Sequence, residues 1–237
     1  MKRSLRGCEA AGEILGAMMA ADGSGAPTCK RRSPDASARA PRANRVAGVV
    51  LAGGRSSRMG GVDKAFLQAE GRVLIPETLD LLRNCFPEVV VVANRPDKFR
   101  SLGVTVTGDE FPGCGPLAGI HAAMGVVATP YVFVLACDMP FVQRATIEFL
   151  VQRLDSQDAL IPRWDGDIEP LHGIYATRLR PRIEEALRAG VTAIRAFLPE
   201  IDADFVGEAQ MRAVPGAERS FLNINTPEDA ARFDLRL

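Results

Sequence analysis

The chain has 237 residues, of which 47% are hydrophobic and 24% are charged, and its 29 basic side chains balance its 29 acidic ones. This composition is that of an ordinary globular protein, and the neutral balance gives no sign of a nucleic acid or a membrane as partner. Five scattered cysteines without a CxxC pair favour a reducing cytoplasm over a disulfide framework or a zinc site.

Residues 1–45 differ in composition from the rest of the chain. They hold nine basic and four acidic residues, and residues 23–45 are rich in Ala, Arg, Ser, Pro and Gly. Such a stretch buries too little apolar surface to offset the entropy lost on ordering. Glu9 and Glu13 also interrupt the region where a secretory signal needs apolar residues. We therefore expect a disordered basic extension over residues 1–45 and a single folded domain over residues 46–237.

From residue 46 onward, short apolar runs alternate with helical patterns. The runs at 46–52, 89–93, 104–107 and 131–136 read as strands, and 76–85, 115–127 and 142–154 read as helices. This alternation predicts right-handed crossovers and an α/β fold with a mainly parallel central sheet covered on both faces. Further strands are predicted at 158–162, 169–177 and 221–224, and helices at 180–188, at 192–198 and from Thr226 onward. In such sheets ligands bind at the carboxyl ends of the strands.

The first strand leads into a glycine-rich loop, LAGGRSSRMGGVDK, at residues 51–64. Glycines allow backbone N–H groups to approach phosphate oxygens, and the cations add charge. Lys64 is followed by Ala65 rather than Ser or Thr, which excludes a Walker loop. The acidic residue that a dinucleotide-binding fingerprint needs after the second strand is absent, since that strand ends in Asn94. The loop therefore predicts a polyphosphate site of another kind.

Two aspartates follow predicted strands. Asp138 leaves the strand at 131–136, and Asp109 leaves the strand at 104–107, just before a second glycine-rich turn, GCGPLAG. Carboxylate oxygens suit Mg²⁺ held on a phosphate. Two glycine loops and two aspartates at one sheet edge predict a metal-nucleotide site.

These motifs carry a family resemblance. LAGGRSSRMGGVDKA, VVVVANR, GPLAGIHAAM, FVLACDMPF, PLHGIY and NINTPED together resemble the molybdenum cofactor guanylyltransferases, over essentially all of residues 46–237. The resemblance implies a three-layer α/β/α Rossmann-like nucleotidyltransferase fold of the GT-A-like type. It also implies that GTP and the molybdopterin cofactor are the substrates, that Mg²⁺ is the cofactor, and that contact with molybdenum-cofactor insertion or delivery proteins is transient.

The resemblance also assigns roles to individual residues. Lys64, Arg58 and Asp138 would be catalytic, and Asp138 would bind Mg²⁺. Nucleotide contacts would come from Leu51, Ala52, Gly53, Lys64, Asn94, Asp109 and Asp138. Further motif positions, some on the side of the second substrate, are Gly61, Gly115, Gly119, Asn223 and Asn225.

Other interpretations remain open on the sequence alone. A molybdopterin cytidylyltransferase or a sugar-phosphate nucleotidyltransferase would share most of these motifs. A GTP-binding signalling module is disfavoured by the missing Walker loop, and a nicotinamide-dependent oxidoreductase by the missing acid. Trp164 and the DGD that follows it read as a mobile turn and a candidate lid over substrate, and His172 is a candidate to face the pterin.

Overall fold

The computed structural model describes residues 42–53, 58–59, 62–63, 68–69, 72–233 and 235–236. Of the expected extension at 1–45, residues 1–41 lie outside the described residues, and residues 42–45 are described. The folded domain is therefore seen over residues 42–236 with those gaps. In the part of the chain described, no helix is long and apolar enough to cross a membrane.

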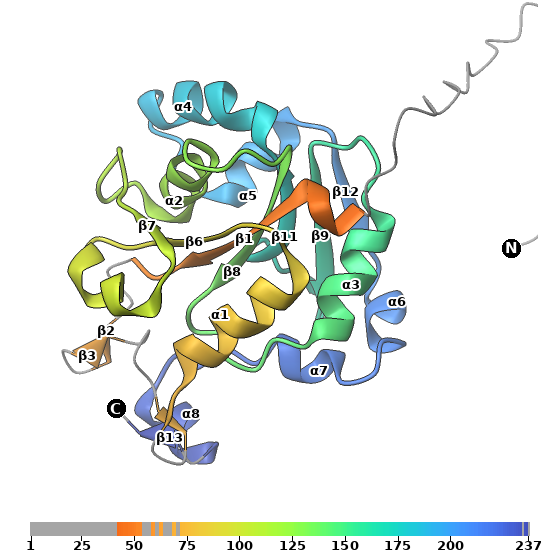
Figure 1. The fold of residues 1–237 in the computed structure, drawn as a ribbon. Helices are drawn as coiled ribbons and strands as arrows, with labels where there is room; N and C mark the ends of the chain where they lie inside the picture. The colour runs from red at the N-terminus through yellow and green to blue at the C-terminus, as the bar shows by residue number, and fades with distance from the viewer. Residues whose placement is uncertain are drawn as a thin grey trace, which may run out of the picture. The chain divides into compact units, whose positions relative to one another are not determined.

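The central sheet has the strand order β10-β9-β11-β8-β1-β6-β7, with β12 paired to β9 (Figure 1). Its parallel portion consists of β8 (Tyr131–Ala136), β1 (Val46–Leu51), β6 (Val89–Val92) and β7 (Thr105–Thr107). On the other side of β8, β11 (His172–Ala176) runs antiparallel to both β8 and β9 (Ala159–Trp164). The two remaining strands are β10 (Asp167–Ile168), antiparallel to β9, and β12 (Ala203–Val206), parallel to it.

Helices cover both faces of this sheet. All six residues of β1 are buried, and the side chains of its five non-glycine residues are divided between two hydrophobic clusters on opposite faces. Val46 and Val50 belong to the cluster that includes residues of α1 (Leu74–Cys85), α3 (Arg144–Arg153) and α7 (Ala217–Ser220). Ala47 and Val49 belong to the cluster of α2 (Gly115–Met124), α4 (Arg180–Arg188) and α5 (Ile194–Phe197). The predicted three-layer α/β/α fold with a mainly parallel sheet is confirmed.

Short elements complete the described chain. The helical ones are η1 (Arg42–Arg45), η4 (Pro96–Leu102), η5 (Thr177–Leu179), η6 (Leu198–Glu200), α6 (Glu208–Arg212) and α8 (Pro227–Arg232). The two-residue strands outside the central sheet are β2 (Arg58–Met59) with β3 (Val62–Asp63), and β4 (Gln68–Ala69) with β5 (Arg72–Val73) and β13 (Leu235–Arg236).

The predicted strand at 221–224 is wrong. Phe221 and Ile224 are buried while the residues between them are partly exposed, a spacing of three rather than the alternation of a strand. This segment links α7 to α8 as a turn and a loop. The predicted helix after Thr226 is confirmed, and the Thr226 side chain caps it by accepting a hydrogen bond of 3.1 Å from the Asp229 N–H.

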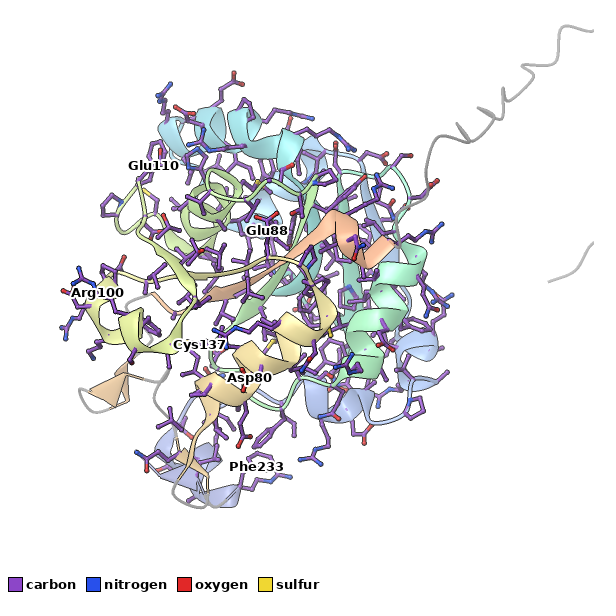
Figure 2. The ribbon with its side chains drawn as sticks, in the orientation of Figure 1. Asp80, Glu88, Arg100, Glu110, Cys137 and Phe233 are labelled. Atoms are coloured by element: carbon purple, nitrogen blue, oxygen red, sulfur yellow. The ribbon has the colours of Figure 1, made fainter. Side chains whose placement is uncertain are left out.

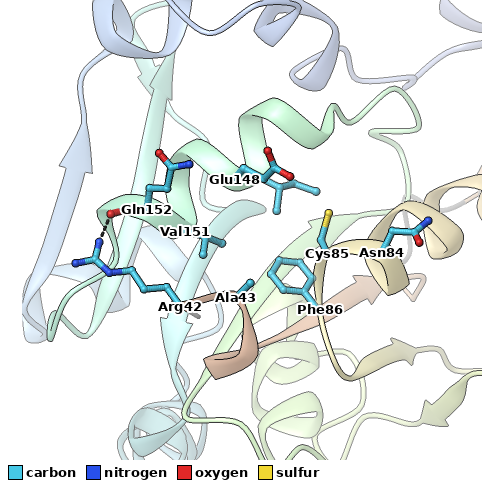
Figure 3. A pocket seen from close by; sticks show the side chains of 9 residues that line it. Arg42, Ala43, Asn84, Cys85, Phe86, Glu148, Val151 and Gln152 are labelled. Atoms are coloured by element: carbon cyan, nitrogen blue, oxygen red, sulfur yellow. Dashed lines mark hydrogen bonds between the residues drawn. The ribbon is translucent and has the colours of Figure 1, made fainter. Parts of the chain in front are cut away.

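The two ends of the strands define two different regions of the surface. At the amino ends of the strands, a largely apolar pocket of about 390 Å³ lies among η1, α1 and α3 (Figure 3). The carboxyl ends of β1, β6, β7 and β8 lie at the opposite edge. The amino end of β11 also lies at that edge because β11 runs antiparallel to β8. The predicted site residues that follow these strands are therefore gathered at the second edge.

Candidate functional site

The end of β1 is the centre of the candidate site. The Leu51 carbonyl accepts a hydrogen bond of 3.2 Å from the Cys137 N–H, and the Ala52 N–H donates one of 2.8 Å to the Val92 carbonyl. These bonds continue the sheet one step past the strand ends and tie the loops that leave β1, β6 and β8 to one another. Leu51 and Ala52 are buried, whereas Gly53 is exposed.

Gly53 and Asn94 lie side by side. A Cβ placed on Gly53 would come within 3.3 Å of the Asn94 side-chain Nδ2, so a side chain at residue 53 would press on Asn94. Asn94 is itself exposed, directly after β6. The structure therefore brings these two predicted nucleotide contacts together at an accessible position.

Asp109 reaches the same place from β7. A Cβ on Gly119 would lie 3.0 Å from the Leu51 Cδ2 and 3.7 Å from the Asp109 Oδ1, so Leu51, Asp109 and α2 meet at Gly119. The Asp109 Oδ1 is buried and has no hydrogen-bond partner among the described residues. Burial raises the pKa of this carboxyl above its ordinary value. A buried acceptor without a donor is costly, and a bound ligand could supply the donor.

Asp138 and the NxN segment form the other half of the site. Asp138 follows β8 and is partly exposed, and its carbonyl accepts a hydrogen bond of 2.8 Å from the Ile224 N–H. Ile224 lies between Asn223 and Asn225, so this bond brings both predicted asparagines to Asp138. Figure 2 shows neighbouring Cys137 at the lower end of the sheet.

Glu169 is a residue that the sequence analysis did not select. It is partly exposed and lies just before β11. Burial, and then the charges of Asp167, Asp138 and Asp165, raise its pKa, while Arg195 opposes them. Its place near Asp138 follows from the antiparallel direction of β11, which the residue pattern of a single strand does not reveal.

The turn after Trp164, predicted to be a lid, is tied down. The Arg212 Nη2 donates to the Asp165 Oδ1 over 2.7 Å, and the Gly166 N–H donates to the Glu208 Oε2 over 2.9 Å. Arg195 donates to both carboxylate oxygens of Asp167, over 2.5 and 2.9 Å. These bonds, from α6 on one side and α5 on the other, favour a fixed hairpin over a moving lid.

His172 does not face a pocket. Its side chain is fully buried, with the Phe133 ring at 5.2 Å and the Phe221 ring at 4.8 Å. Neither ring nitrogen has a hydrogen-bond partner among the residues described, and burial lowers the pKa of the imidazole to about 3. His172 is therefore a neutral core residue and no candidate to bind the pterin.

The remaining predicted residues either lie farther from the end of β1 or fall outside the residues that the structure describes. Gly115 begins α2 with a φ of 72°, and a Cβ on it would meet the Thr192 carbonyl oxygen at 3.2 Å, on the α5 side. Arg58 lies in β2, and nothing of its side chain is described. Lys64 and Gly61 fall outside the described residues.

A divalent cation would find oxygen donors here. The described residues hold no cluster of three or more His, Cys, Asp or Glu side chains suited to a metal ion. Mg²⁺ needs less, since it usually takes one or two carboxylates together with waters and substrate phosphates. Asp138, with Glu169 close enough to feel its charge, is a donor set that fits Mg²⁺ bound jointly with a nucleotide.

Comparison with known proteins places the chain in a family. The model of the MobA-like NTP transferase domain matches residues 48–204. A probable molybdenum cofactor guanylyltransferase from Pelotomaculum thermopropionicum is 35% identical over 185 residues, which cover 78% of this chain and 90% of that protein. The molybdenum cofactor guanylyltransferase of Syntrophotalea carbinolica is 38% identical over 183 residues, covering 76% and 87% of the two chains.

Solved structures share the fold. The crystal structure of molybdopterin-guanine dinucleotide biosynthesis protein A from Archaeoglobus fulgidus superposes with a TM-score of 0.69 at 30% identity, covering 79% of this chain and 96% of that one. A Mycobacterium tuberculosis protein crystallised with manganese has a TM-score of 0.54 at 19% identity, covering 80% and 98% of the two chains. At that identity the second likeness shows the fold alone.

Proposed function

The chain belongs to the family of MobA-like NTP transferases and is a nucleotidyltransferase, and from that premise we propose that it transfers GMP from GTP to the terminal phosphate of the molybdopterin cofactor. Pyrophosphate is released, and the product is the guanine dinucleotide form of the cofactor. The printed names of the relatives support this choice of substrates. Contact with proteins that insert or deliver the cofactor would be transient, and the reducing cytoplasm is the proposed setting.

The observation that carries the proposal is the buried, unpartnered Oδ1 of Asp109 beside Leu51 and Gly119. A nucleoside hydroxyl or base N–H would supply the missing donor. Asn94 and the backbone at Leu51 to Gly53 lie along the same sheet edge, and one bound nucleotide would contact them together with Asp109.

In the proposed reaction an oxygen of the cofactor's terminal phosphate attacks the α-phosphorus of GTP. The bond from that phosphorus to the bridging oxygen of the β-phosphate breaks, and the electron pair leaves with pyrophosphate. The attacking oxygen is already anionic at neutral pH, so the chain need not supply a general base. Lys64, Arg58 and the loop amides would hold the triphosphate in line and offset its growing charge.

Asp138 is the proposed ligand of Mg²⁺, and Asn223 and Asn225 would lie toward the second substrate. When bound, the cation would neutralise phosphate charge and assist the departure of pyrophosphate. Residues 46–237 would form the whole catalytic domain.

Nucleotide labelling at the α-phosphate tests the proposal. The purified protein is mixed with molybdopterin, Mg²⁺ and either labelled GTP or labelled CTP. Transfer of label from GTP with release of pyrophosphate is expected. Transfer from CTP alone would make the protein a cytidylyltransferase, and release of orthophosphate would identify a GTP hydrolase instead.

A further inference from the structure

The loop that carries Asp109, residues 108–114 between β7 and α2, is attached both to α2, which borders the candidate site, and to α4, which lies behind α2. We call it the Asp109 loop. Glu110 lies beside α4, with which it forms an ion pair through Arg180 (Figure 2). The position of Asp109 therefore depends on how its neighbours in the loop are held.

Glu110 is held by Arg180, the first residue of α4. The Arg180 Nη2 donates to the two carboxylate oxygens of Glu110, over 2.9 and 3.3 Å. The Arg180 side chain is 34% exposed, and its Nε is buried without a hydrogen-bond partner among the described residues. This guanidinium is thus partly enclosed by protein and engaged with the loop through its outer nitrogen.

The end of α2 leaves room for this guanidinium. Gly125, the C-terminal cap of α2, has φ −77° and ψ −16°, a helical conformation open to any residue. A Cβ there would lie 3.1 Å from the Arg180 Nε and 3.3 Å from its Nη2. A side chain at residue 125 would therefore press on the Arg180 guanidinium, although the backbone angle there admits any residue.

A ring contact holds the next residue of the loop. Phe111 meets His121 of α2 edge-on, with ring centroids 5.3 Å apart, and the Phe111 carbonyl accepts a hydrogen bond of 3.2 Å from the Cys114 N–H. His121 is fully buried. The Asp109 loop is thus fixed to α2 at Phe111 and to α4 at Glu110.

We propose that Arg180 is a positioning residue of this enzyme: through Glu110 it holds the Asp109 loop in the conformation that presents Asp109 to the nucleoside. This inference rests on the proposed function for its effect on GTP. The loop contacts themselves do not depend on that function. Loss of the ion pair would free one end of the loop, which weakens GTP binding while leaving the reacting phosphates untouched.

Arg180→Met, Glu110→Gln and the double variant test the role of the ion pair in GTP binding. Each single change should raise the KM and Kd for Mg-GTP about two- to fivefold, the range of a partly exposed ion pair, with kcat nearly unchanged. The double variant should bind Mg-GTP no more weakly than the weaker-binding single variant, because the two substitutions break the same ion pair. The matched control is Arg182→Met, which removes an exposed cation of α4 that donates to the Glu200 carbonyl and should leave KM unchanged.

Gly125→Ala separates positioning from folding. Alanine suits this helical angle and restricts the unfolded chain, so the melting temperature should hold or rise. The new methyl group should nevertheless displace the guanidinium and raise the KM for GTP. Wild-type KM in both Arg180→Met and Gly125→Ala, or additive losses in the double variant of Arg180 and Glu110, would overturn the inference.

Hydrogen exchange of the protein without nucleotide gives a readout independent of GTP. Amides of residues 108–114 should exchange faster in Arg180→Met and Gly125→Ala than in the wild type or Arg182→Met. Unchanged exchange would refute the attachment of the loop. If the wild-type protein failed to bind GTP while this exchange pattern held, the proposed function would fail and the loop attachment would stand.

Discussion

Asp109 combines an expected role in binding with a cost to folding. Because burial raises its pKa, the ionised carboxylate is less favourable in the folded protein than in the unfolded chain at neutral pH. A group placed this way is typical of binding sites, where the ligand supplies the missing partner.

Asp109→Asn should therefore stabilise the protein and impair the enzyme. Removing the charge while keeping the shape should raise the melting temperature by about 2 °C, allowing for partial solvent exposure. Loss of a charged acceptor should weaken GTP binding by roughly tenfold or more. Thermal unfolding and calorimetric titration with Mg-GTP measure the two effects. A less stable variant with normal affinity would show that Asp109 is a structural residue.

His172 gives the folded protein a pH dependence of known sign. Its pKa falls to about 3 in the folded state from about 6.5 in an unfolded chain. The unfolded state alone takes up this proton, so stability is fully present above about pH 6.5 and is lost as the pH falls through the window below it.

Urea unfolding at pH 7 and pH 5 measures this effect in the wild type and in His172→Leu. Once the unfolded state is fully protonated, His172 should contribute a slope of about 1.4 kcal/mol per pH unit. The wild type should therefore lose more stability than the variant between the two values. Burial also lowers the pKa of His121, so the variant should retain part of the slope. Equal losses in both proteins would mean that His172 takes up its proton in the folded protein as readily as in the unfolded chain.

At the scale of elements, the sequence predicts where strands end, but it does not predict which strands pair or in which direction they run. Runs of apolar residues located β1, β6 and β8, and the residues after them, such as Asp138, followed at once. Glu169 was missed because the direction of β11 depends on its pairing with β8, which no local pattern encodes. The segment from Phe221 to Ile224 was misjudged because its apolar residues pack at a spacing of three.

The turn into α2 offers a matched pair of glycines. Gly113 and Gly115 have φ values of 81° and 72°. A Cβ on Gly115 would meet the Thr192 carbonyl oxygen at 3.2 Å, whereas a Cβ on Gly113 would have no atom of the described residues within 4 Å. Alanine at either position should cost about 1–2 kcal/mol for the left-handed backbone.

Gly115→Ala should cost more than Gly113→Ala, because the new methyl group must also move Thr192 or the start of α2. Urea unfolding of the two variants gives this difference directly, with the backbone penalty common to both. If Gly113→Ala proved equally destabilising, the contact with Thr192 would carry no weight.

At the scale of the whole molecule, the predicted site residues lie at one edge of the sheet and the apolar pocket lies at the other. The carboxyl edge gathers Asn94, Asp109 and Asp138, while the amino edge holds η1 and the apolar pocket. Alternation of strand and helix was enough to predict this division, since parallel strands joined by crossovers bring their carboxyl ends together. Lys64 and Gly61 of the glycine-rich loop lie outside the described residues, so their roles stay predictions.

The division between edges also predicts how the protein responds to truncation. Arg42 donates a hydrogen bond to the Gln152 carbonyl, Ala43 packs against the core, and the Arg45 guanidinium lies 5.4 Å from the centre of the Tyr131 ring. These contacts belong to η1, at the edge away from the nucleotide site.

Removing residues 1–41 should therefore change neither stability nor kcat/KM, whereas removing 1–45 should cost about 1–2 kcal/mol of stability with kcat/KM preserved. Urea unfolding and the GTP labelling assay on both truncated proteins check this. A loss of kcat/KM in the shorter truncation would extend the catalytic domain into residues 1–41.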